Sequence, residues 1–397
     1  MTRLQAALLA ATLMASGAGA QDAKGKGAPT VASATPPTQD YLLYTVAESA
    51  DQAALVRFGP KGIRIERQQK VGMMPTEING PHGITVSPDG KFYYISIAHG
   101  TPYGTLWKFR TDNDQFVGRT TLGLFPATVQ TTPDGSLAFV VIFNLHGDMV
   151  PSSVSVVSTE EMVEIARITT CTMPHGSRIN PTGTLQYSGC MMDDMLVEVD
   201  TRALEVSRHF QLAKGKEMGM PGAPSGMSHA GHTAGSAVSH DSVMLSASSV
   251  QCSPTWAQPS ADGAKVYVAC NKSNEIVEID VTSWTMTRRW ATGEGVYNLA
   301  VSPDGKYLVA TNKRGKSISV FDLATAREVA RVPTFKGVVH GVVISPDNRF
   351  AFVTEEGRGS EAGILEVFDL RTFTSVAILE LGQQAAGIDF YRVEPVR

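Results

Sequence analysis

Three histidines recur at one position of an internal repeat, and imidazole is a common metal ligand in proteins. The repeat contains a turn of the Pro-Asp-Gly type, and His82, His175 and His340 each lie eight residues before its last residue. The chain has nine histidines in all, so this position holds a third of them. Neutral imidazoles that converge from separate strands can bind Cu, Zn, Fe or Ni. The spacing predicts a fixed metal site; the alternative is that each ring only hydrogen-bonds a neighbouring element.

A second group of metal-binding side chains lies in a stretch rich in Gly, Ser, Ala and Pro. The interval between Pro174 and Pro254 is about 35 residues longer than one repeat requires, and residues 213–250 are this surplus. They contain Met218, Met220, Met227, His229, His232, His240 and Met244. Thioether sulfur favours Cu(I), and imidazole suits both oxidation states of copper. We predict that this segment recruits or covers a copper ion, so copper is the expected cofactor; the alternative is a disordered polar loop.

The four cysteines occupy matching places in two neighbouring repeats. Cys171 and Cys252 precede inner strands, whereas Cys190 and Cys270 end the second strands. In an exported protein paired disulfides are the default interpretation, which predicts Cys171–Cys190 and Cys252–Cys270. Two alternatives stay open: a pair between Cys190 and Cys252, and thiolate ligation of copper by Cys190 with the methionines that follow it.

Charged residues near the same face favour another function, a metal-assisted hydrolase or oxidase. Arg178 lies on an inner strand, where a charge needs a partner or a ligand, and Glu355 ends the strand beside His340. Such groups could bind an anion and act as a general base, so Glu355 and Arg178 are the candidate catalytic residues. Acidic side chains that are simply exposed are the commoner case. The same face also carries Glu356, Asp193, Asp194, His99 and His146.

These residues share a face because the chain is built from repeated β-hairpins. An apolar run enters the turn Pro88-Asp89-Gly90 and returns as a second β-rich run, which is a hairpin signature. Similar turns recur at 132–135, 180–183, 260–263, 302–305 and 345–348. Most spacings are about 40 to 48 residues, the period of four-stranded propeller blades. Strand direction alternates within a blade, so the start of each inner strand and the end of each second strand lie together.

The two ends of the chain complete one blade between them. Residues 41–70 contain three strand-like runs without an inner strand, and residues 386–393 form an inner strand with nothing after it. Joining them removes exposed sheet edges. We therefore predict an all-β fold, a seven-bladed β-propeller of four-stranded antiparallel blades, closed by the C-terminal strand joining the N-terminal three.

Two segments of the later blades resemble a known repeat. They are Tyr267-Val268-Ala269-Cys270-Asn271, continuing through Ile276–Asp280, and Tyr307–Asn312. The chain is therefore similar to the YVTN-repeat seven-bladed β-propellers, which share a broad superfamily with nitrous-oxide-reductase-like and lactonase-like propellers. The resemblance implies the fold over nearly all of the mature chain. It does not fix an activity, because the group includes surface, binding and enzymatic proteins.

The first residues have the pattern of an export signal. Residues 1–20 combine a positive charge, a short apolar core and a small-residue cleavage site; residues 21–40 read as a flexible linker, and residues 41–397 as the propeller. No later apolar run is long enough to span a bilayer. The net charge of −4 gives no reason to expect a nucleic-acid partner. We predict a periplasmic or secreted protein.

The preferred hypothesis is an exported propeller that binds copper at its channel mouth, for metal handling or redox chemistry. One alternative is the hydrolase or oxidase, which resembles propeller lactonases in outline. Another is an interaction scaffold whose rim binds a periplasmic protein or a small-molecule ligand. All three place the functional groups on the same face of the ring.

Overall fold

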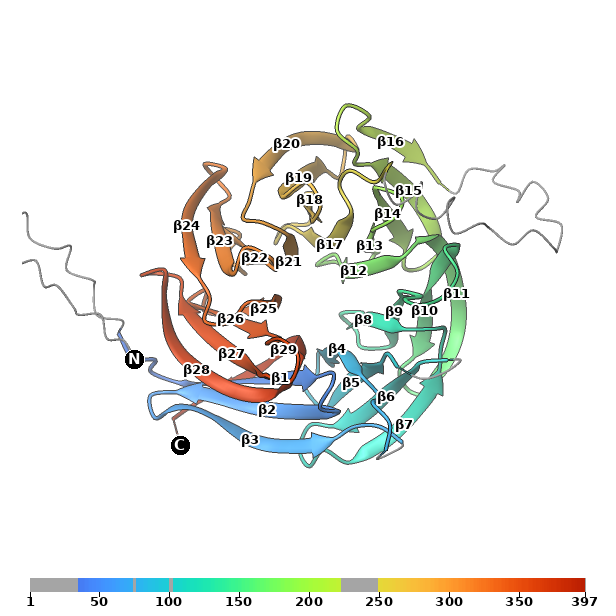
Figure 1. Cartoon of the computed structure of the whole chain (residues 1–397). Coiled ribbons are helices and arrows are strands. Elements are labelled where there is room, and N and C mark those ends of the chain that lie inside the picture. The colour runs from blue at the N-terminus through green and yellow to red at the C-terminus, as the bar shows by residue number, and fades with distance from the viewer. Residues whose placement is uncertain (1–34, 74–75, 100–102, 223–248, 397) are drawn as a thin grey trace, which may run out of the picture. The chain divides into compact units, whose positions relative to one another are not determined.

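The computed structural model describes residues 35–73, 76–99, 103–222 and 249–396. These residues form seven antiparallel sheets arranged as a ring, which confirms the predicted seven-bladed propeller (Figure 1). From the inner to the outer strand, the blades are β4 (Pro81–Val86), β5 (Phe92–Ile97), β6 (Thr105–Arg110) and β7 (Phe116–Thr121); β8 (Pro126–Thr131), β9 (Leu137–Ile142), β10 (Pro151–Ser158) and β11 (Val163–Thr172); β12 (Pro174–Ile179), β13 (Leu185–Cys190), β14 (Met195–Asp200), β15 (Glu205–Gln211) and β16 (Met218–Pro221); β17 (Pro254–Pro259), β18 (Lys265–Cys270), β19 (Glu275–Asp280) and β20 (Thr285–Ala291); β21 (Val296–Val301), β22 (Tyr307–Asn312), β23 (Ser317–Asp322) and β24 (Arg327–Pro333); β25 (Val339–Ile344), β26 (Phe350–Glu355), β27 (Ala362–Asp369) and β28 (Thr374–Gln383); and β29 (Ala385–Glu394), β1 (Asp40–Ala47), β2 (Gln52–Gly59) and β3 (Gly62–Lys70).

The turn between the two innermost strands of a blade satisfies its own backbone. In the first blade the Ser87 hydroxyl donates to the Asp89 carboxylate (2.6 Å) and accepts the Phe92 N–H (2.9 Å). Gly90 has a φ of +69°, a left-handed conformation that glycine adopts without steric cost. The same serine–aspartate pair closes the corresponding turns of the fourth, fifth and sixth blades. This repeated chemistry fixes the register of the inner strands.

The ring closes as predicted, because β29 pairs antiparallel with β1. The first residue of β1, Asp40, lies opposite the last residue of β29, Glu394. Buried Arg57 on β2 binds both carboxylates, at 2.9 Å and 3.0 Å. The two ends of the chain are therefore joined by backbone pairing and by one shared cation.

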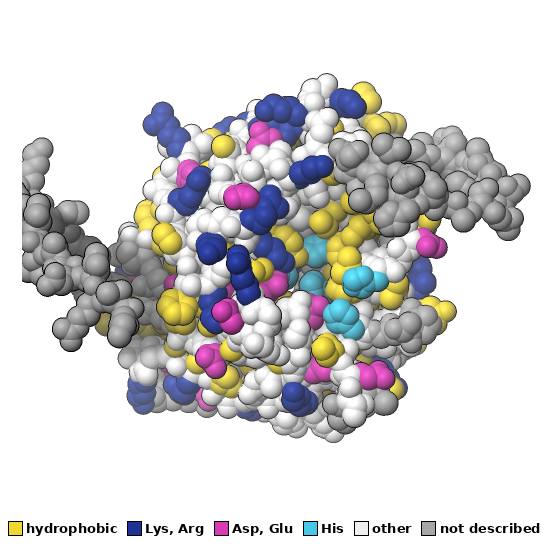
Figure 2. Space-filling view, viewed as in Figure 1, with side chains coloured by type: hydrophobic (Ala, Val, Ile, Leu, Met, Phe, Trp, Pro, Cys, Tyr) yellow, Lys and Arg dark blue, Asp and Glu magenta, His cyan; other side chains and the backbone are white. Residues whose placement is uncertain are grey.

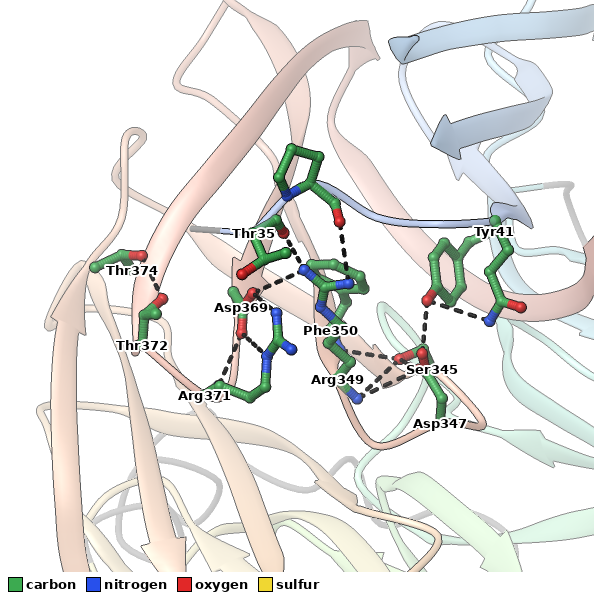
Figure 3. Close-up of polar contacts among 12 residues, drawn as sticks. Thr35, Tyr41, Ser345, Asp347, Arg349, Phe350, Asp369, Arg371, Thr372 and Thr374 are labelled. Carbon is green, nitrogen blue, oxygen red and sulfur yellow. Dashed lines mark hydrogen bonds and ion pairs between the residues drawn. The ribbon is translucent and has the colours of Figure 1, made fainter. Parts of the chain in front are cut away.

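The N-terminal segment also makes hydrogen bonds with the sixth blade, the neighbour of the closing blade in the ring (Figure 3). Tyr41 on β1 donates a hydrogen bond to Asp347 (2.6 Å), which lies in the turn before β26. Arg349 donates to the carbonyl oxygen of Pro36 (3.3 Å) and stacks over Phe350 at 4.5 Å. Residues before the first strand are thus fixed to a blade that is more than 300 positions away in the sequence.

Both predicted disulfides are present. Cys171 and Cys190 are joined across the boundary between the second and third blades, and Cys252 and Cys270 are joined within the fourth. No free cysteine remains. The alternatives of a Cys190–Cys252 bridge and of thiolate copper ligation are wrong, because every sulfur is already bonded.

The predicted Met/His segment begins differently from the expected loop. Met218 and Met220 belong to β16, a fifth strand that pairs with β15 at the outer edge of the third blade. Three strands separate it from β12 at the channel, so these two methionines do not cover the channel mouth. Met227, His229, His232, His240 and Met244 lie outside the described residues, as does the predicted export signal. Among the described residues, no helix has the length and apolar character needed to cross a membrane.

Candidate functional site

The three repeated histidines converge at one end of the central channel. Each is the second residue of an inner strand: His82 of β4, His175 of β12 and His340 of β25. The centre of the His82 ring lies 5.8 Å from that of His175 and 5.5 Å from that of His340. We call this end of the channel the histidine mouth. Figure 2 shows histidine side chains gathered in the hollow at the middle of this face.

A carboxylate from the closing blade orients His82. Glu48, the residue after β1, contacts His82 Nδ1 at 2.7 Å through Oε2, and His99 Nε2 at 2.7 Å through Oε1. Burial alone would raise the pKa of Glu48, but the two imidazoles lower it to about 2, so the carboxylate is ionised. The His82 Nδ1 therefore donates its hydrogen to Glu48, and in the neutral ring Nε2 is left as an acceptor.

His175 and His340 are held in the neutral state. Burial, with the charge of His82 nearby, lowers the pKa of His175 to about 3. Its Nδ1 lies 3.2 Å from the carbonyl oxygen of Thr255 and its Nε2 lies 3.0 Å from the Tyr297 hydroxyl, so both nitrogens have protein partners. Burial and the Lys313 ammonium lower the pKa of His340 well below its ordinary value.

A small cavity below the three rings collects unpaired polar atoms. Its volume is about 30 Å³. Three buried atoms on its lining residues have no hydrogen-bond partner among the described residues: His82 Nε2, Trp256 Nε1 and Asn298 Oδ1. Unsatisfied buried groups are rare and each costs about 1–3 kcal/mol, so a cluster of them indicates a place for a polar guest. The volume suits a water molecule or the reacting end of a ligand.

Arg178 on β12 brings a positive charge to the same cavity. Its guanidinium lies 4.5 Å from the centre of the Trp256 ring and donates a hydrogen bond to the carbonyl oxygen of Ser177 (3.0 Å). No carboxylate lies within 4 Å of it in the part of the chain that the structure describes. Burial lowers the pKa of Arg178 to about 10, so it remains cationic at neutral pH. Asp389, more than 4 Å away, is the carboxylate whose charge acts on Arg178.

The rim of the histidine mouth divides into two halves. Glu356 binds Lys313 at 2.7 Å and lies 3.7 Å from His340 Nε2, which makes one half charged. Phe125 and Phe143 form the other half and pack against His82 and His175 with ring centres 5.4 Å and 4.8 Å apart. In Figure 2, Lys and Arg side chains lie on one side of the central hollow and hydrophobic side chains on the other. A ligand with one polar and one apolar end would match this division.

The remaining predicted groups lie elsewhere. Glu355 accepts the Lys336 N–H and faces Glu366, and it does not line the cavity, so it is not the expected base beside His340. Asp194 accepts the N–H groups of residues 251–253 at 2.7 to 2.9 Å, which makes it a structural cap. Asp193 likewise accepts the Thr172 N–H. His146 is exposed.

Sequence reasoning missed Glu48, although a signal existed. The residue that follows the second strand faces the mouth in several blades, as Phe143, Lys313 and Glu356 show. Glu48 holds the same place after β1. Trp256 and Asn298 were also missed; each is the third residue of its inner strand, one position beyond the histidine position.

The three imidazoles do not form a metal site as they stand. Among the described residues, no group of three or more His, Cys, Asp or Glu side chains has a geometry that could hold a metal ion. The reason is visible at His175, whose two nitrogens are occupied by Thr255 and Tyr297. His82 Nε2 is left without a partner among the described residues, whereas His340 hydrogen-bonds the backbone of Ala386.

Comparison with known proteins supports the fold. A family model described as "Lactonase, 7-bladed beta-propeller" matches residues 33–151. The chain is similar to lactonase-type propellers. The periplasmic gluconolactonase of Pseudomonas aeruginosa has 16% identity and a TM-score of 0.65, over 89% of this chain and 99% of its own. The hydrazine synthase of Kuenenia stuttgartiensis has 17% identity and a TM-score of 0.60, over 82% and 99%. At these identities structural similarity establishes the fold alone, and no curated protein matches the sequence.

Proposed function

We propose that this protein is an exported hydrolase that opens a small lactone at the histidine mouth, with His82 as the general base. The observation that carries the proposal is the Glu48–His82 pair, in which a buried carboxylate orients one ring nitrogen at 2.7 Å and leaves the other unpaired. A base held by a third group is the usual arrangement for activating a nucleophile. The partial match to a lactonase family model and the gluconolactonase among similar structures agree with it.

The reaction needs only groups present at the mouth. His82 Nε2 removes a proton from a water molecule, and the water oxygen bonds to the lactone carbonyl carbon. The bond from that carbon to the ring oxygen then breaks, and the proton on Nε2 passes to the departing alkoxide. The product is a hydroxy acid. Glu48 stabilises the imidazolium that exists between the two proton transfers, because it is ionised and in contact with Nδ1.

Arg178 supplies the positive charge that this chemistry requires. The carbonyl oxygen gains negative charge as water attacks, and the guanidinium lines the same cavity as His82. Asp389, the carboxylate whose charge acts on it, lies more than 4 Å away in the described part of the chain. A fixed cation in a water-poor site stabilises developing negative charge more strongly than bulk water does. The predicted export signal, the two disulfides and the similarity to the structure of a periplasmic gluconolactonase all favour a location outside the cytoplasm.

Turnover of a lactone panel that includes δ-valerolactone and gluconolactone tests the proposal. We expect His82→Ala to lower kcat/KM by at least 100-fold, the lower range for loss of a general base, and Glu48→Gln by about tenfold or more. His146→Ala, an exposed histidine of the same face, is the matched control and should change the rate by less than twofold. Absence of turnover on every lactone, or equal losses in the His82 and His146 variants, would contradict the proposal.

A second candidate, binding of a transition metal such as copper, is favoured by the packing of two imidazoles, those of His175 and His340, around the ring of His82. Rings that share one ion at a metal–nitrogen distance of about 2.0–2.1 Å have centres about 5 Å apart, and the observed 5.5 and 5.8 Å are close to that. His175 could join such a site only by giving up its bond to Tyr297. The recruiting role of the segment around His229 and His232 remains a prediction.

Elemental analysis of protein purified without a His tag tests the metal candidate. If it is right, copper is present in a stoichiometric amount, and His82→Ala or His340→Ala removes it. Tyr297→Phe should then strengthen copper binding, because it frees His175 Nε2. Metal-free protein that also fails to take up added copper would leave the hydrolase as the function of this mouth.

A further inference from the structure

A larger cavity opens at the end of the channel opposite the histidine mouth. Its volume is about 390 Å³, within the range of small-molecule sites. The lining residues come from the fifth and later positions of inner strands, including Thr85 on β4, Gln130 on β8 and Asp389 on β29, and from the turns that follow β4, β8 and β12. The histidines are the second residues of the same kind of strand, so the two sites lie at different depths of one channel.

The floor of this cavity carries a carboxylate and an amide with unused bonding capacity. Asp389 accepts hydrogen bonds from the Thr85 hydroxyl (3.1 Å) and the Val86 N–H (2.8 Å) through Oδ2 and from the Phe390 N–H (2.9 Å) through Oδ1, and no cation lies within 4 Å of it among the described residues. Gln130 uses its Oε1 to accept the Ile179 N–H at 2.7 Å, and its Nε2 donors have no partner in the described part of the chain. The cavity therefore offers an acceptor on β29 and a donor on β8, the inner strands that lie on either side of β4.

The side chains at the fifth position of the seven inner strands have no net charge, because they include one cation and one anion. The fifth residues of the seven inner strands are Thr85, Gln130, Arg178, Gln258, Ala300, Val343 and Asp389. One cation and one anion stand among two amides, a hydroxyl and two apolar side chains, and Arg178 and Asp389 interact electrostatically. Asp389 lines this cavity, whereas Arg178 lines the small cavity at the histidine mouth. An anion would therefore be repelled by Asp389, and the attraction of Asp389 for a cation is offset by the charge of Arg178. Pro88, Pro133, Pro181, Phe390 and Tyr391 give the lining an apolar part, which lies next to polar side chains that include Ser87, Thr131 and Asn180.

We propose that this larger cavity binds a small neutral polyol, a ligand with several hydroxyl groups and no net charge. A hydroxyl group both donates and accepts, so adjacent hydroxyls can donate to the Asp389 carboxylate and accept from the Gln130 amide. The C–H faces of the ligand then contact the proline and aromatic walls. The site is separate from the Glu48–His82 pair and does not depend on hydrolysis.

Calorimetric titration of the full chain with three ligands of one carbon skeleton tests the class: sorbitol, which is neutral; gluconate, an anion; and glucamine, a cation. We expect saturable binding of sorbitol that is at least fivefold tighter than that of either charged ligand and is retained in His82→Ala. Gln130→Glu keeps the acceptor for Ile179 and removes the free donors, so it should weaken sorbitol binding about tenfold. Gln258→Glu is the matched control, because Gln258 has the same strand position but does not line the cavity.

Tyr391→Leu provides a second test that leaves the polar floor intact, and loss of the aromatic wall should weaken sorbitol binding at least threefold. The proposal is overturned if sorbitol does not bind, if glucamine or gluconate binds more tightly than sorbitol, or if Gln130→Glu and Gln258→Glu have equal effects. Thermal unfolding of each variant shows whether a weaker titration reflects the site or an unfolded chain.

Discussion

At the scale of single residues, Glu48 links catalysis to stability. Its carboxylate contacts two imidazoles at 2.7 Å each, so the ionised form is strongly preferred in the folded protein. The pKa of Glu48 is lowered to about 2 from an ordinary value of 4.5, and its contribution to stability is therefore complete above pH 4.5 and lost as pH falls through about 2. The group that orients the proposed base also helps to hold the first and last blades together at neutral pH.

The pKa of Glu355 is shifted in the opposite direction to that of Glu48, so its effect on stability also has the opposite dependence on pH. Burial and a hydrogen bond with the Glu366 carboxyl raise the pKa of Glu355 to about 9. Below pH 4.5 the side chain is protonated in both the folded and the unfolded chain. Between pH 4.5 and 9 only the unfolded chain releases the proton, so stability falls as pH rises, by at most about 1.4 kcal/mol per pH unit. Glu355 is therefore a source of pH sensitivity and not the catalytic base that its place in the sequence indicates.

We predict that Glu355→Gln removes this dependence. The amide cannot ionise, and its oxygen can still accept the Lys336 N–H. The melting temperature of the variant relative to the wild type should therefore increase by several degrees between pH 5 and pH 8, measured by circular dichroism. Glu294→Gln, at an exposed rim position, is the control and should show a constant difference. A constant difference for Glu355→Gln as well would show that Glu355 is ionised in the folded protein.

At the scale of strands and turns, the histidine mouth could be predicted because each of the three histidines lies eight residues before the last residue of a recognisable turn. The Ser-Pro-Asp-Gly turns fix hairpin register through their own side-chain bonds, and a fixed register makes an eight-residue spacing a position in space. His82, His175 and His340 could therefore be placed together from the sequence. For Glu48 this count was not possible, because β29 and β1 come from the two ends of the chain and no turn joins them; its place after a second strand was the one signal for it.

The strand β16 was missed for a different reason. Its four residues are too few to show the alternation that marks a half-buried strand, and pairing with β15 uses backbone groups that every residue carries. Met218 and Met220 were therefore assigned to copper because of their sulfur atoms, although strand pairing determines where they lie. The cysteines were predictable because their matching places in two blades are a property of the repeat.

At the scale of the whole molecule, stability depends on how the ring closes. The strand pairs of β29 and β1 form one continuous sheet from the two ends of the chain, and Arg57 binds Asp40 and Glu394 at its edge. Opening the ring therefore requires the rupture of a whole set of backbone hydrogen bonds. Closure of this kind also keeps the seven inner strands in one circle, on which the convergence of the three histidines depends.

A circular permutant can measure this contribution. Because Asp40 lies opposite Glu394, a short turn can join the two residues, and new ends can be placed between β3 and β4. Every blade is then continuous in sequence, and no strand from one end pairs with the other end. We expect the permutant to keep its β-sheet circular dichroism spectrum and to unfold at least tenfold faster in denaturant, a change of about 1.4 kcal/mol in the unfolding barrier. Arg349→Ala in the natural order removes the contact with Pro36 but keeps the shared sheet, and it should accelerate unfolding much less. Equal unfolding rates for the permutant and the natural chain would mean that packing between blades, without the shared sheet, is enough to keep the ring closed.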